Sequence, residues 1–464
     1  MAGVENLRVR LMPNDSARHY AVIGGGWAGC AAAVTLAAAG SQVSLFEAGK
    51  ILGGRARRIE IDGRTLDNGQ HILLGAYGAS LKLMKQVGVK PAEALLRLPL
   101  QMRYPLQAGG EGMDFVAPRL PAPLHVAIAL LRAKGLGKED KMALARFSTT
   151  ARWMGWQLHE DCSVAELLER FEQTPRLIRL MWNPLCIAAL NTPPERASAK
   201  VFLNVLRDSL GARRAASDML IPRIDLSAIL PQAAAAYIGQ RGGQAITGTA
   251  VGCLHATGDA GTWRLEDRQG GNLGEFAGII IATGADAAAQ LLDGARGPAS
   301  ACDTSALHAL AYEPITTCYL QYAPTLRLPL PFCALADDPQ RRAWGQFAFD
   351  RGQLSADAAD AGLLAVVVSA AGQAIADGHA ALLDGIAQQL AVDFGRPELS
   401  IPQWSKVITE KRATFSCTPG LQRPINTGLP SGLALAGDYV AGDYPATLEG
   451  AVRSGIAAAR IVAA

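Results

Sequence analysis

Residues 19–29, HYAVIGGGWAG, are the stretch that decides the fold of this chain. Residues 19–26 predict a short apolar strand that runs into glycines, and the small residues from Ala28 to about Ala39 predict a helix that ends at Gly40. Residues 42–48, QVSLFEA, then alternate as a second strand. Strand, glycine-rich turn, helix and strand in this order form the βαβ unit that opens a dinucleotide-binding domain.

The turn carries the pattern G-x-G-x-x-G at Gly24, Gly26 and Gly29. The first glycine permits the tight turn, the second lets a pyrophosphate approach the backbone, and the third lets helix and strand pack closely. The N-terminus of the helix adds partial positive charge. We therefore expect Trp27 and Ala28 to lie beside a bound dinucleotide together with the three glycines.

Glu47 ends the second strand, 18 residues after Gly29. A carboxylate at this place accepts hydrogen bonds from both ribose hydroxyls and repels a 2′-phosphate. FAD or NAD is therefore favoured over NADP, with a solvent-facing acid at the strand end as the alternative.

The bulk composition limits the class of protein. The chain has 464 residues, half of them apolar, which is enough for two folded domains. Its net charge of +3 lacks the dense basic footprint of a nucleic-acid binder. The eight cysteines form no C-x-x-C pair, so we expect no metal site, no disulfide framework and free thiols in a reducing compartment.

Targeting and membrane-spanning signals are missing from the sequence. Residues 1–18 lack the apolar centre of a signal peptide. No apolar run reaches the ~20 residues that a membrane-spanning helix needs. We expect a cytoplasmic protein that is at most peripheral on the inner face of the cytoplasmic membrane.

The order of the remaining patterns predicts an α/β protein with an inserted α+β domain. Helix signals include the capping box of Ser163 and Glu166, the Thr174-Pro175 start and a helix over 194–210. Strands are expected at 244–256, 262–266, 275–282, 312–322, 363–370 and 432–439. The buried strand runs on to Gly284, which we also expect at the nucleotide. The predicted nucleotide domain comprises 19–80, 220–290 and 405–464, and the predicted substrate domain comprises 81–219 and 291–404.

Gly53-Gly54-Arg55 follows the second strand and resembles a turn of the flavin-dependent amine oxidase and phytoene desaturase superfamily. The resemblance implies a Rossmann-like FAD-binding domain and FAD as the cofactor. The two glycines would let the backbone lie against the cofactor, and Arg55 would neutralise phosphate charge. A solvated basic loop is the alternative.

The end of the chain has a second resemblance. Residues 437–455, GDYVAGDYPATLEGAVRSG, are similar to the carboxy-terminal FAD motif of plant-type phytoene desaturases. Residues 242–251, GGQAITGTAV, resemble the strand that holds the adenine in these flavoproteins. The matches imply these further cofactor residues: Val251, Gly437, Asp438, Glu449, Gly450 and Ala451.

Two further stretches resemble the hydroxysqualene dehydroxylases, also described as squalene-associated FAD-dependent desaturases. They are LDNGQHILLGAY (66–77) and MWNPLCIAALNTPPERAS (181–198), and the likeness extends over nearly the whole chain from about residue 19. It implies a bacterial enzyme of squalene and hopanoid biosynthesis that reduces hydroxysqualene to squalene. A carotenoid desaturase of the same fold and a non-catalytic prenyl-lipid carrier are the alternatives. No second dinucleotide fingerprint is apparent, so the electron donor is expected to be external.

Loss of an allylic hydroxyl requires a proton for the departing water and hydride delivery to an allylic cation. The acid candidates are His71, Asp67 and Asp443, since their motifs should converge near the flavin. His71 is equally a candidate for a structural histidine, and Asp67 for a turn residue before Asn68-Gly69. The π-faces of Tyr439, Tyr444 and Trp182 are candidates to line the path of the cation, with plain core packing as the alternative.

Residues 123–134, PLHVAIALLRAK, join an apolar run to basic residues. Such a segment is typical of a helix that lies in a membrane interface and admits a lipid substrate. A buried helix with a charged end is the alternative.

Overall fold

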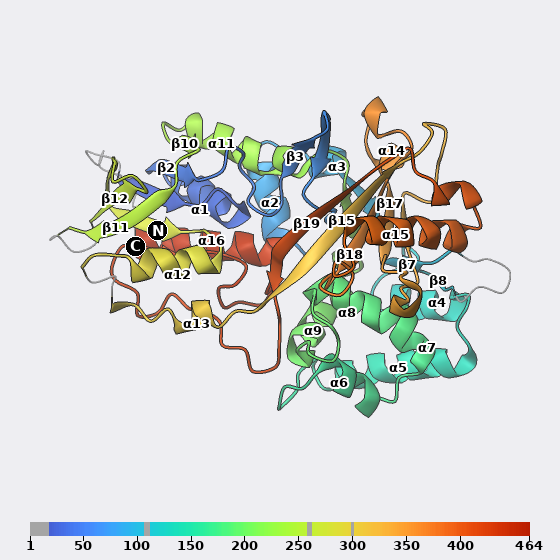
Figure 1. Ribbon diagram of the computed structural model, residues 1–464. Helices are drawn as coiled ribbons and strands as arrows, with labels where there is room; N and C mark the ends of the chain where they lie inside the picture. Colours follow the sequence, from blue (N-terminus) through green and yellow to red (C-terminus); the bar gives the residue numbers. More distant parts are fainter. Residues whose placement is uncertain (1–17, 106–111, 258–261, 298–300) are drawn as a thin grey trace, which may run out of the picture.

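The computed structural model describes residues 18–105, 112–257, 262–297 and 301–464. A parallel sheet with its helices lies on the left of Figure 1, and an antiparallel sheet with helices above and below it lies on the right. Residues 1–17, for which the sequence predicts no signal peptide, lie outside the described residues.

The parallel sheet joins strands from three distant parts of the chain in the order β10-β2-β1-β14-β20. Every neighbouring pair runs parallel, and all four residues of β14 are buried, as its apolar run predicts. The expected Rossmann-like α/β fold is therefore confirmed. The strands are β1 (His19–Ile23), β2 (Gln42–Glu47), β10 (Gln244–Thr247), β14 (Gly278–Ile281) and β20 (Leu433–Leu435).

Helix α1 (Trp27–Ala38) starts and ends within one residue of its predicted bounds. Ten of its twelve residues are buried, because it packs against both the sheet and helix α16 (Leu448–Ala463). A Cβ at Gly455 of α16 would come within 2.1 Å of the carbonyl oxygen of Ala28, so the two helices touch backbone to backbone. The small residues of α1 permit this approach.

Two expected single strands are each divided in the structure. The prediction of one strand over 244–256 was wrong: Gly248, with φ +73°, ends β10, and β11 (Val251–Ala256) starts a separate antiparallel sheet. The apolar run at 275–282 is likewise divided between β13 (Asn272–Phe276) of that small sheet and β14. Strand β12 (Trp263–Asp267) lies between β11 and β13.

The second large sheet is antiparallel, with the order β16-β17-β18-β15-β19. The sequence predicts β15 and β18 but not the other three strands. The longest, β19, is an edge strand whose charged residues hide any apolar alternation. The strands are β15 (Tyr312–Gln321), β16 (Phe332–Ala334), β17 (Phe347–Asp350), β18 (Leu363–Ser369) and β19 (Trp404–Phe415), and helix α15 (His379–Phe394) packs on β15 and β19.

A helical layer lies below this sheet in Figure 1. The capping box of Ser163 and Glu166 and the Thr174 cap with Pro175 are confirmed. The predicted helix over 194–210 is only partly right, because Ser198 caps a shorter helix and residues 207–211 widen into a π-helical turn. The layer contains α4 (Leu124–Arg132), α5 (Lys138–Trp153), α6 (Val164–Arg170), α7 (Pro175–Leu177), the π-helical turn η1 (Ile178–Trp182), α8 (Asn183–Leu190), α9 (Ala199–Leu206) and the π-helical turn η2 (Arg207–Gly211).

Short strands between these helices were not predicted, because two to four residues are too few to show a period of two. They are β5 (Leu73–Leu74), β6 (Leu95–Leu98), β7 (Gln101–Arg103), β8 (Asp114–Val116) and β9 (Met219–Pro222). The other elements near the parallel sheet are β3 (Arg58–Ile61), β4 (Arg64–Asp67), α2 (Gly78–Gln86), α3 (Pro91–Ala94), α10 (Leu226–Ile229), α11 (Pro231–Gly239), α12 (Ala285–Asp293) and α13 (Ser305–His308).

All eight cysteines are free thiols. Among the described residues, no helix combines the length and the apolar character needed to cross a membrane.

Candidate active site

The β1–α1 turn needs two of its glycines for packing. Gly24 has φ +106°, and a Cβ on it would lie 2.6 Å from the carbonyl oxygen of Ala282. A Cβ on Gly29 would lie 1.9 Å from the carbonyl oxygen of Gly24. Gly26 differs, because a Cβ there would meet nothing nearer than the Cα of Gly54 at 3.9 Å. Gly26 therefore presents bare backbone to open space, as the second glycine of a dinucleotide turn should.

Glu47 closes the turn from the end of β2. Its Oε2 accepts from the backbone N–H of Gly25 and its Oε1 from that of Gly49, both at 2.7 Å. The carboxylate is thus oriented by the backbone on both oxygens while it still lines the cavity. Each oxygen keeps a further lone pair, so the predicted ribose contact stays open to it.

Arg55 and Asp438 join the two ends of the chain. The guanidinium of Arg55 donates to Oδ1 of Asp438 at 2.5 Å and to the carbonyl oxygen of Ala413 at 2.8 Å. Asp438 is buried and Arg55 is partly exposed. The sequence predicts both as cofactor residues but not their pairing. Because Asp438 compensates the charge of Arg55, the arginine is less free to neutralise a phosphate than we expected.

One continuous cavity of about 820 Å³ begins at the β1–α1 turn and extends under the helical layer. Most of the predicted cofactor residues line it, although they come from four separate segments of the chain. Those that do are Gly24, Gly26, Trp27, Ala28, Glu47, Gly53, Gly54, Arg55, Val251, Gly284, Gly437, Asp438 and Ala451.

Three predicted cofactor residues do not line the cavity: Gly29, Glu449 and Gly450. Glu449 is fully buried, and its carboxylate accepts from the backbone N–H groups of Ala79 and Ser80 and from the Ser80 hydroxyl. It therefore anchors the start of α2, where a carboxylate is favoured by the helix dipole. A Cβ on Gly450 would lie 1.9 Å from the carbonyl oxygen of Tyr444. We place these residues in the wall behind the cavity.

Two buried polar atoms of cavity-lining residues have no partner among the described residues: Nε1 of Trp27 and the hydroxyl of Tyr439. A buried donor without a partner costs about 1–3 kcal/mol, so such groups normally bind a ligand or water. Both lie in residues of the predicted cofactor motifs. Together with the bare backbone at Gly26, these donors fit a bound dinucleotide.

Tyr439 lines the cavity beside the predicted cofactor residues Gly437 and Asp438, and its place along the path of a cation stays a prediction. Its ring packs on Gly437, where a Cβ would come within 2.3 Å of ring atom Cε1. The charges that act on its hydroxyl come from Asp438, Tyr312 and Arg55, and burial is the largest influence that raises its pKa. A tyrosine among these groups is suited to contact the cofactor.

The other half of the cavity is apolar. Trp182 is fully buried in η1, its Nε1 donates to Oε1 of Gln173 at 2.9 Å, and its ring lies 4.5 Å from that of Phe147. Trp182 lines the cavity, and its predicted role beside a cation stays a prediction. Its apolar and aromatic neighbours on the wall are Leu100, Met102, Phe115, Val126, Leu144, Phe147, Trp156, Met181, Leu185, Val205, Leu206, Met219, Ile315, Phe347, Phe349 and Val367.

His71 lines the cavity from the loop before β5, but it is poorly suited to act as an acid. Burial lowers the pKa of its imidazole, and the positive charge of Arg55 lowers it further, although the carbonyl of Gly69 opposes both. Nδ1 lies 3.0 Å from that carbonyl oxygen and so carries the ring proton of the neutral form. His71 thus offers the cavity an acceptor at Nε2 and not a proton.

The other two acid candidates lie outside the cavity lining. Asp443 is exposed in the loop before α16. Asp67 is buried at the end of β4, where its Oδ1 accepts from the backbone N–H of Leu226 at 2.9 Å. The sequence could not show this, because side chains close together in the sequence can point either into the cavity or away from it.

Asp67→Asn is expected to stabilise the protein increasingly as the pH rises. Burial raises the pKa of Asp67 to about 7 from 3.8, so the native state holds the proton more tightly than the unfolded state. The stability that the protonated carboxyl contributes is full below about pH 4 and is lost as the pH rises through about 7. Within this window, the free energy of unfolding of the variant minus that of the wild type should increase by at most roughly 1.4 kcal/mol per pH unit.

Urea denaturation across this pH range measures the gain, with the exposed Asp443→Asn as the matched control. Equal pH dependence of the wild type and Asp67→Asn would contradict the assignment of a raised pKa to this carboxyl.

Sequence reasoning missed Asp208, which lines the cavity from η2. Burial acts to raise the pKa of its carboxyl, but hydrogen bonds from Arg207 and Tyr444 outweigh burial and the pKa is lowered. The Nε of Arg207 donates to Oδ1 of Asp208 at 2.7 Å. Among the described residues of 81–219, Asp208 is the one acidic side chain on the cavity wall. Nothing in the local sequence RDSLG marks it, because the π-helical turn that aims it is set by packing.

Tyr444, a predicted lining residue, connects Asp208 to the carboxy-terminal motif. Its hydroxyl is hydrogen-bonded to Asp208, and the guanidinium carbon of Arg453 lies 4.3 Å from its ring centroid. Burial raises the pKa of Tyr444 to about 12, so the phenol keeps its proton. The result is an ionised carboxylate held at the border between the apolar wall and the start of α16.

Comparisons with known proteins agree with this geometry. The profile of the flavin containing amine oxidoreductase family matches residues 27–463. The chain is 30% identical to the hydroxysqualene dehydroxylase of Rhodopseudomonas palustris, over 96% of this chain and 98% of that protein. It is 26% identical to the hydroxysqualene dehydroxylase of Zymomonas mobilis, over 94% of this chain and 97% of that protein. The solved structure of a putrescine oxidase has the same fold, with a TM-score of 0.69 and 16% identity over 97% of this chain and 100% of that one.

The fold, the dinucleotide turn and the family match define an FAD-dependent oxidoreductase. Within this class, the chain belongs to the hydroxysqualene dehydroxylase family of the flavin containing amine oxidoreductases. The predictions of FAD as cofactor and of an enzyme are thereby confirmed, and the non-catalytic carrier is the weaker reading of the chain.

Proposed function

We propose that the protein removes the allylic hydroxyl of hydroxysqualene and so forms squalene for squalene and hopanoid biosynthesis. The observation that carries the proposal is the continuity of one cavity, with dinucleotide residues at one end and apolar walls at the other. The relatives' names agree with this chemistry. Overall, hydroxysqualene and reduced FAD give squalene, water and oxidised FAD: the C–O bond breaks, the oxygen takes up one proton and leaves as water, and a hydride forms the new C–H bond. Reduced FAD, when bound, supplies the hydride.

The apolar wall would hold the hydrocarbon and keep water away from the reacting carbon. An allylic cation is captured by any water that reaches it, so a dry site is needed for hydride transfer. The rings of Trp182 and Phe147, which pack together on this wall, suit that task. Aromatic faces also attract positive charge, by about 0.5–2 kcal/mol per contact.

Asp208 would stabilise the positive charge that develops as the hydroxyl leaves. Its carboxylate is ionised, is held by Arg207 and Tyr444, and borders both the apolar wall and the carboxy-terminal motif. The carboxylate is already fixed at the cavity wall, so no reorganisation is needed when positive charge develops beside it. Tyr444 serves as a positioning residue, because it acts through Asp208.

Anaerobic single-turnover experiments test the proposed reaction. The protein is purified with FAD, reduced with dithionite, and mixed with hydroxysqualene in detergent. We expect the flavin to reoxidise and the amount of squalene formed to equal the amount of flavin reoxidised. Oxidised enzyme is the control and should give no squalene.

Phytoene and oxidised enzyme are tested in parallel. A flavin that stays reduced with hydroxysqualene would overturn the proposal, and flavin reduction by phytoene would then favour a carotenoid desaturase. A purified protein that takes up no FAD would overturn the reaction and favour a prenyl-lipid carrier.

A further inference from the structure

Large exposed apolar side chains are concentrated on one part of the surface. Ten such side chains occur among the described residues, and five of them fall between residues 120 and 153. The others are spread singly over the rest of the chain. Scattered exposed apolar residues are ordinary, but a cluster marks an interaction surface. The five are Leu120, Leu124, Leu131, Met142 and Trp153, the last of which is 87% exposed.

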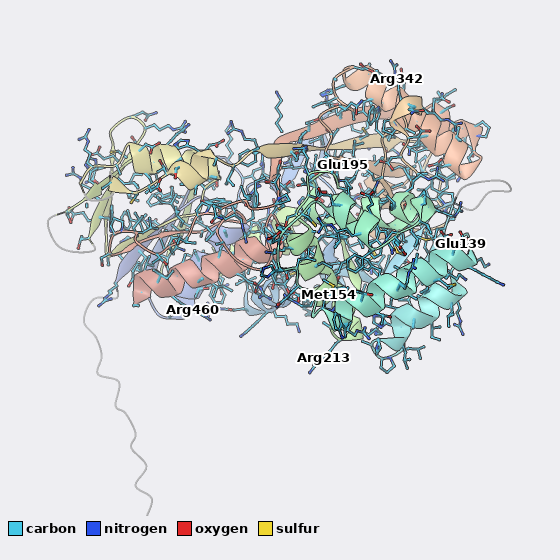
Figure 2. All side chains as sticks on the ribbon, turned by 90° about the horizontal axis from the view of Figure 1, so that it is seen from below. Glu139, Met154, Glu195, Arg213, Arg342 and Arg460 are labelled. Atoms are coloured by element: carbon cyan, nitrogen blue, oxygen red, sulfur yellow. The ribbon has the colours of Figure 1, made fainter. Side chains whose placement is uncertain are left out.

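These side chains form stripes on two helices. On α4, Leu124 and Leu131 are exposed seven residues apart, while His125 and Ala129 on the opposite side are buried. On α5, Met142 and Trp153 are exposed eleven residues apart, which again places them on one side of a helix. Figure 2 shows α5 between the labels of Glu139 and Met154 on the outside of the molecule. We call this surface the α4–α5 face.

The α4–α5 face is strongly basic. Residues 119–152 contain seven Lys or Arg and two Asp or Glu, whereas the whole chain has a net charge of only +3. One of the two acids, Asp140, is buried and bonded to the backbone of Gly137 and to Thr174. Of the seven cations, Arg146 pairs with Glu172 and Lys141 donates to the carbonyl oxygen of Leu131. Six form no ion pair with another described residue: Arg119, Arg132, Lys134, Lys138, Lys141 and Arg152.

A small pocket of about 300 Å³ lies between β8 and the end of α4, and Arg132 and Lys134 line it. Its single acid, Asp114, is paired with Arg103 at 2.7 Å, so the two cations at the pocket remain uncompensated. A pocket with two free cations next to an exposed leucine stripe suits a phosphate that carries acyl chains.

The inner sides of α4 and α5 line the substrate half of the cavity. Val126 of α4 and Leu144, Phe147 and Ser148 of α5 are cavity residues. The α4–α5 face and the cavity are therefore separated by one layer of helix, about 10 Å thick. Of the other five exposed apolar residues, Ile461 lies on a cavity-lining helix, but α16 lines the cavity only with its first turn, at Leu448 and Ala451, far along the helix from Ile461.

We infer that the α4–α5 face docks on an anionic lipid bilayer. Leu124, Leu131, Met142 and Trp153 enter the interface, and Arg132 and Lys134 bind lipid phosphate at the small pocket. Each cation near an anionic surface strengthens the binding, and the exposed apolar side chains strengthen it further. The α4–α5 pair then lies between the bilayer and the cavity. Passage of substrate between the two helices rests on the proposed function, whereas docking does not.

Vesicle co-sedimentation tests the docking with the full chain loaded with FAD. We expect binding to vesicles of equal parts phosphatidylcholine and phosphatidylglycerol, and weak binding to pure phosphatidylcholine. Leu131→Asp with Trp153→Asp should weaken binding at least about tenfold. Arg132→Glu with Lys134→Glu should weaken it at least as much and flatten its dependence on salt.

The matched control replaces exposed apolar residues elsewhere, Ile401→Asp with Ile425→Asp, and should bind as the wild type does. Equal loss in this control, unchanged binding of the α4–α5 variants, or absence of wild-type binding to anionic vesicles would each overturn the proposal. Turnover of hydroxysqualene in detergent is measured in parallel. If the α4–α5 variants lose vesicle binding but keep turnover, the membrane face is distinct from the reaction site. If the protein binds vesicles but never turns over hydroxysqualene, the proposed function is refuted and the docking is not.

Discussion

Gly26→Val is expected to give a folded protein that purifies without FAD. A Cβ at Gly26 would meet no protein atom nearer than 3.9 Å, and the backbone there, with φ −72°, is in a region open to any residue. The added atoms would instead occupy the space where a pyrophosphate approaches the turn. Overpacking of this kind costs about 1–3 kcal/mol or more, so FAD affinity should fall about 100-fold.

The visible flavin absorbance per protein after gel filtration measures this loss, and circular dichroism checks the fold. Gly239→Val is the matched control, because Gly239 is exposed at the end of α11 and a Cβ there meets nothing within 4 Å. Gly24→Ala should fail differently: its Cβ meets backbone at 2.6 Å and its φ is +106°, so the fold itself should be lost. Stoichiometric FAD in Gly26→Val would contradict the assignment of this turn to the cofactor.

Asp208→Asn is expected to slow turnover about 100- to 1000-fold without loss of FAD. The substitution keeps the shape of the side chain, removes its charge and leaves one acceptor oxygen in place of two. Binding of the hydrocarbon depends on the apolar wall and should change little, so kcat should fall while KM is nearly constant. The rate of flavin reoxidation by hydroxysqualene in a stopped-flow instrument measures the effect.

Asp443→Asn is the matched control, because Asp443 belongs to the same group of charges around Arg207 and Arg453 but is exposed and outside the cavity lining. Its rate should equal that of the wild type. A normal rate for Asp208→Asn with bound FAD would refute the role of this carboxylate in catalysis.

Tyr444→Phe provides an independent reading of the same site. The hydrogen bond from Tyr444 helps to hold the pKa of Asp208 low, so its removal should raise that pKa. Activity that needs the ionised carboxylate should then be lost at a higher pH on the acidic side of the pH–rate profile, with the alkaline side unchanged. A uniform fall at every pH would indicate a packing role for the ring.

The nucleotide half of the site was predictable because its signals are local. Gly24, Gly26 and Gly29 must lie within one turn of chain, and the close contacts of Gly24 and Gly29 with backbone show why no other residue fits there. The bounds of α1 were predicted to within one residue, because a run of small residues between two glycines indicates clearly where the helix begins and ends. Resemblance predicts less well which way a side chain points. Ala451 of the carboxy-terminal motif lines the cavity, but the carboxylate of Glu449 in the same motif points to α2.

The substrate half was not predictable to the same degree. Asp67 and His71 are close in sequence, yet one lies outside the cavity lining and the other within it, because side-chain direction depends on the sheet pairing around β4. Asp443 has the carboxyl group that an acid needs, but it lies exposed in a loop outside the cavity lining. Asp208 carries no sequence signal at all and gains its place from a π-helical turn packed against Tyr444.

By itself the sequence determined the Rossmann-like fold, because backbone conformation and close packing at glycines are decided by neighbours along the chain. FAD and the family followed from the resemblance of longer motifs to known families. Tertiary structure alone decided the pairing of Arg55 with Asp438, the ionised carboxylate at Asp208 and the basic apolar surface over the cavity. Each of these features depends on which side chains from distant segments share a desolvated space, and burial and charge at such a place are properties of the folded chain.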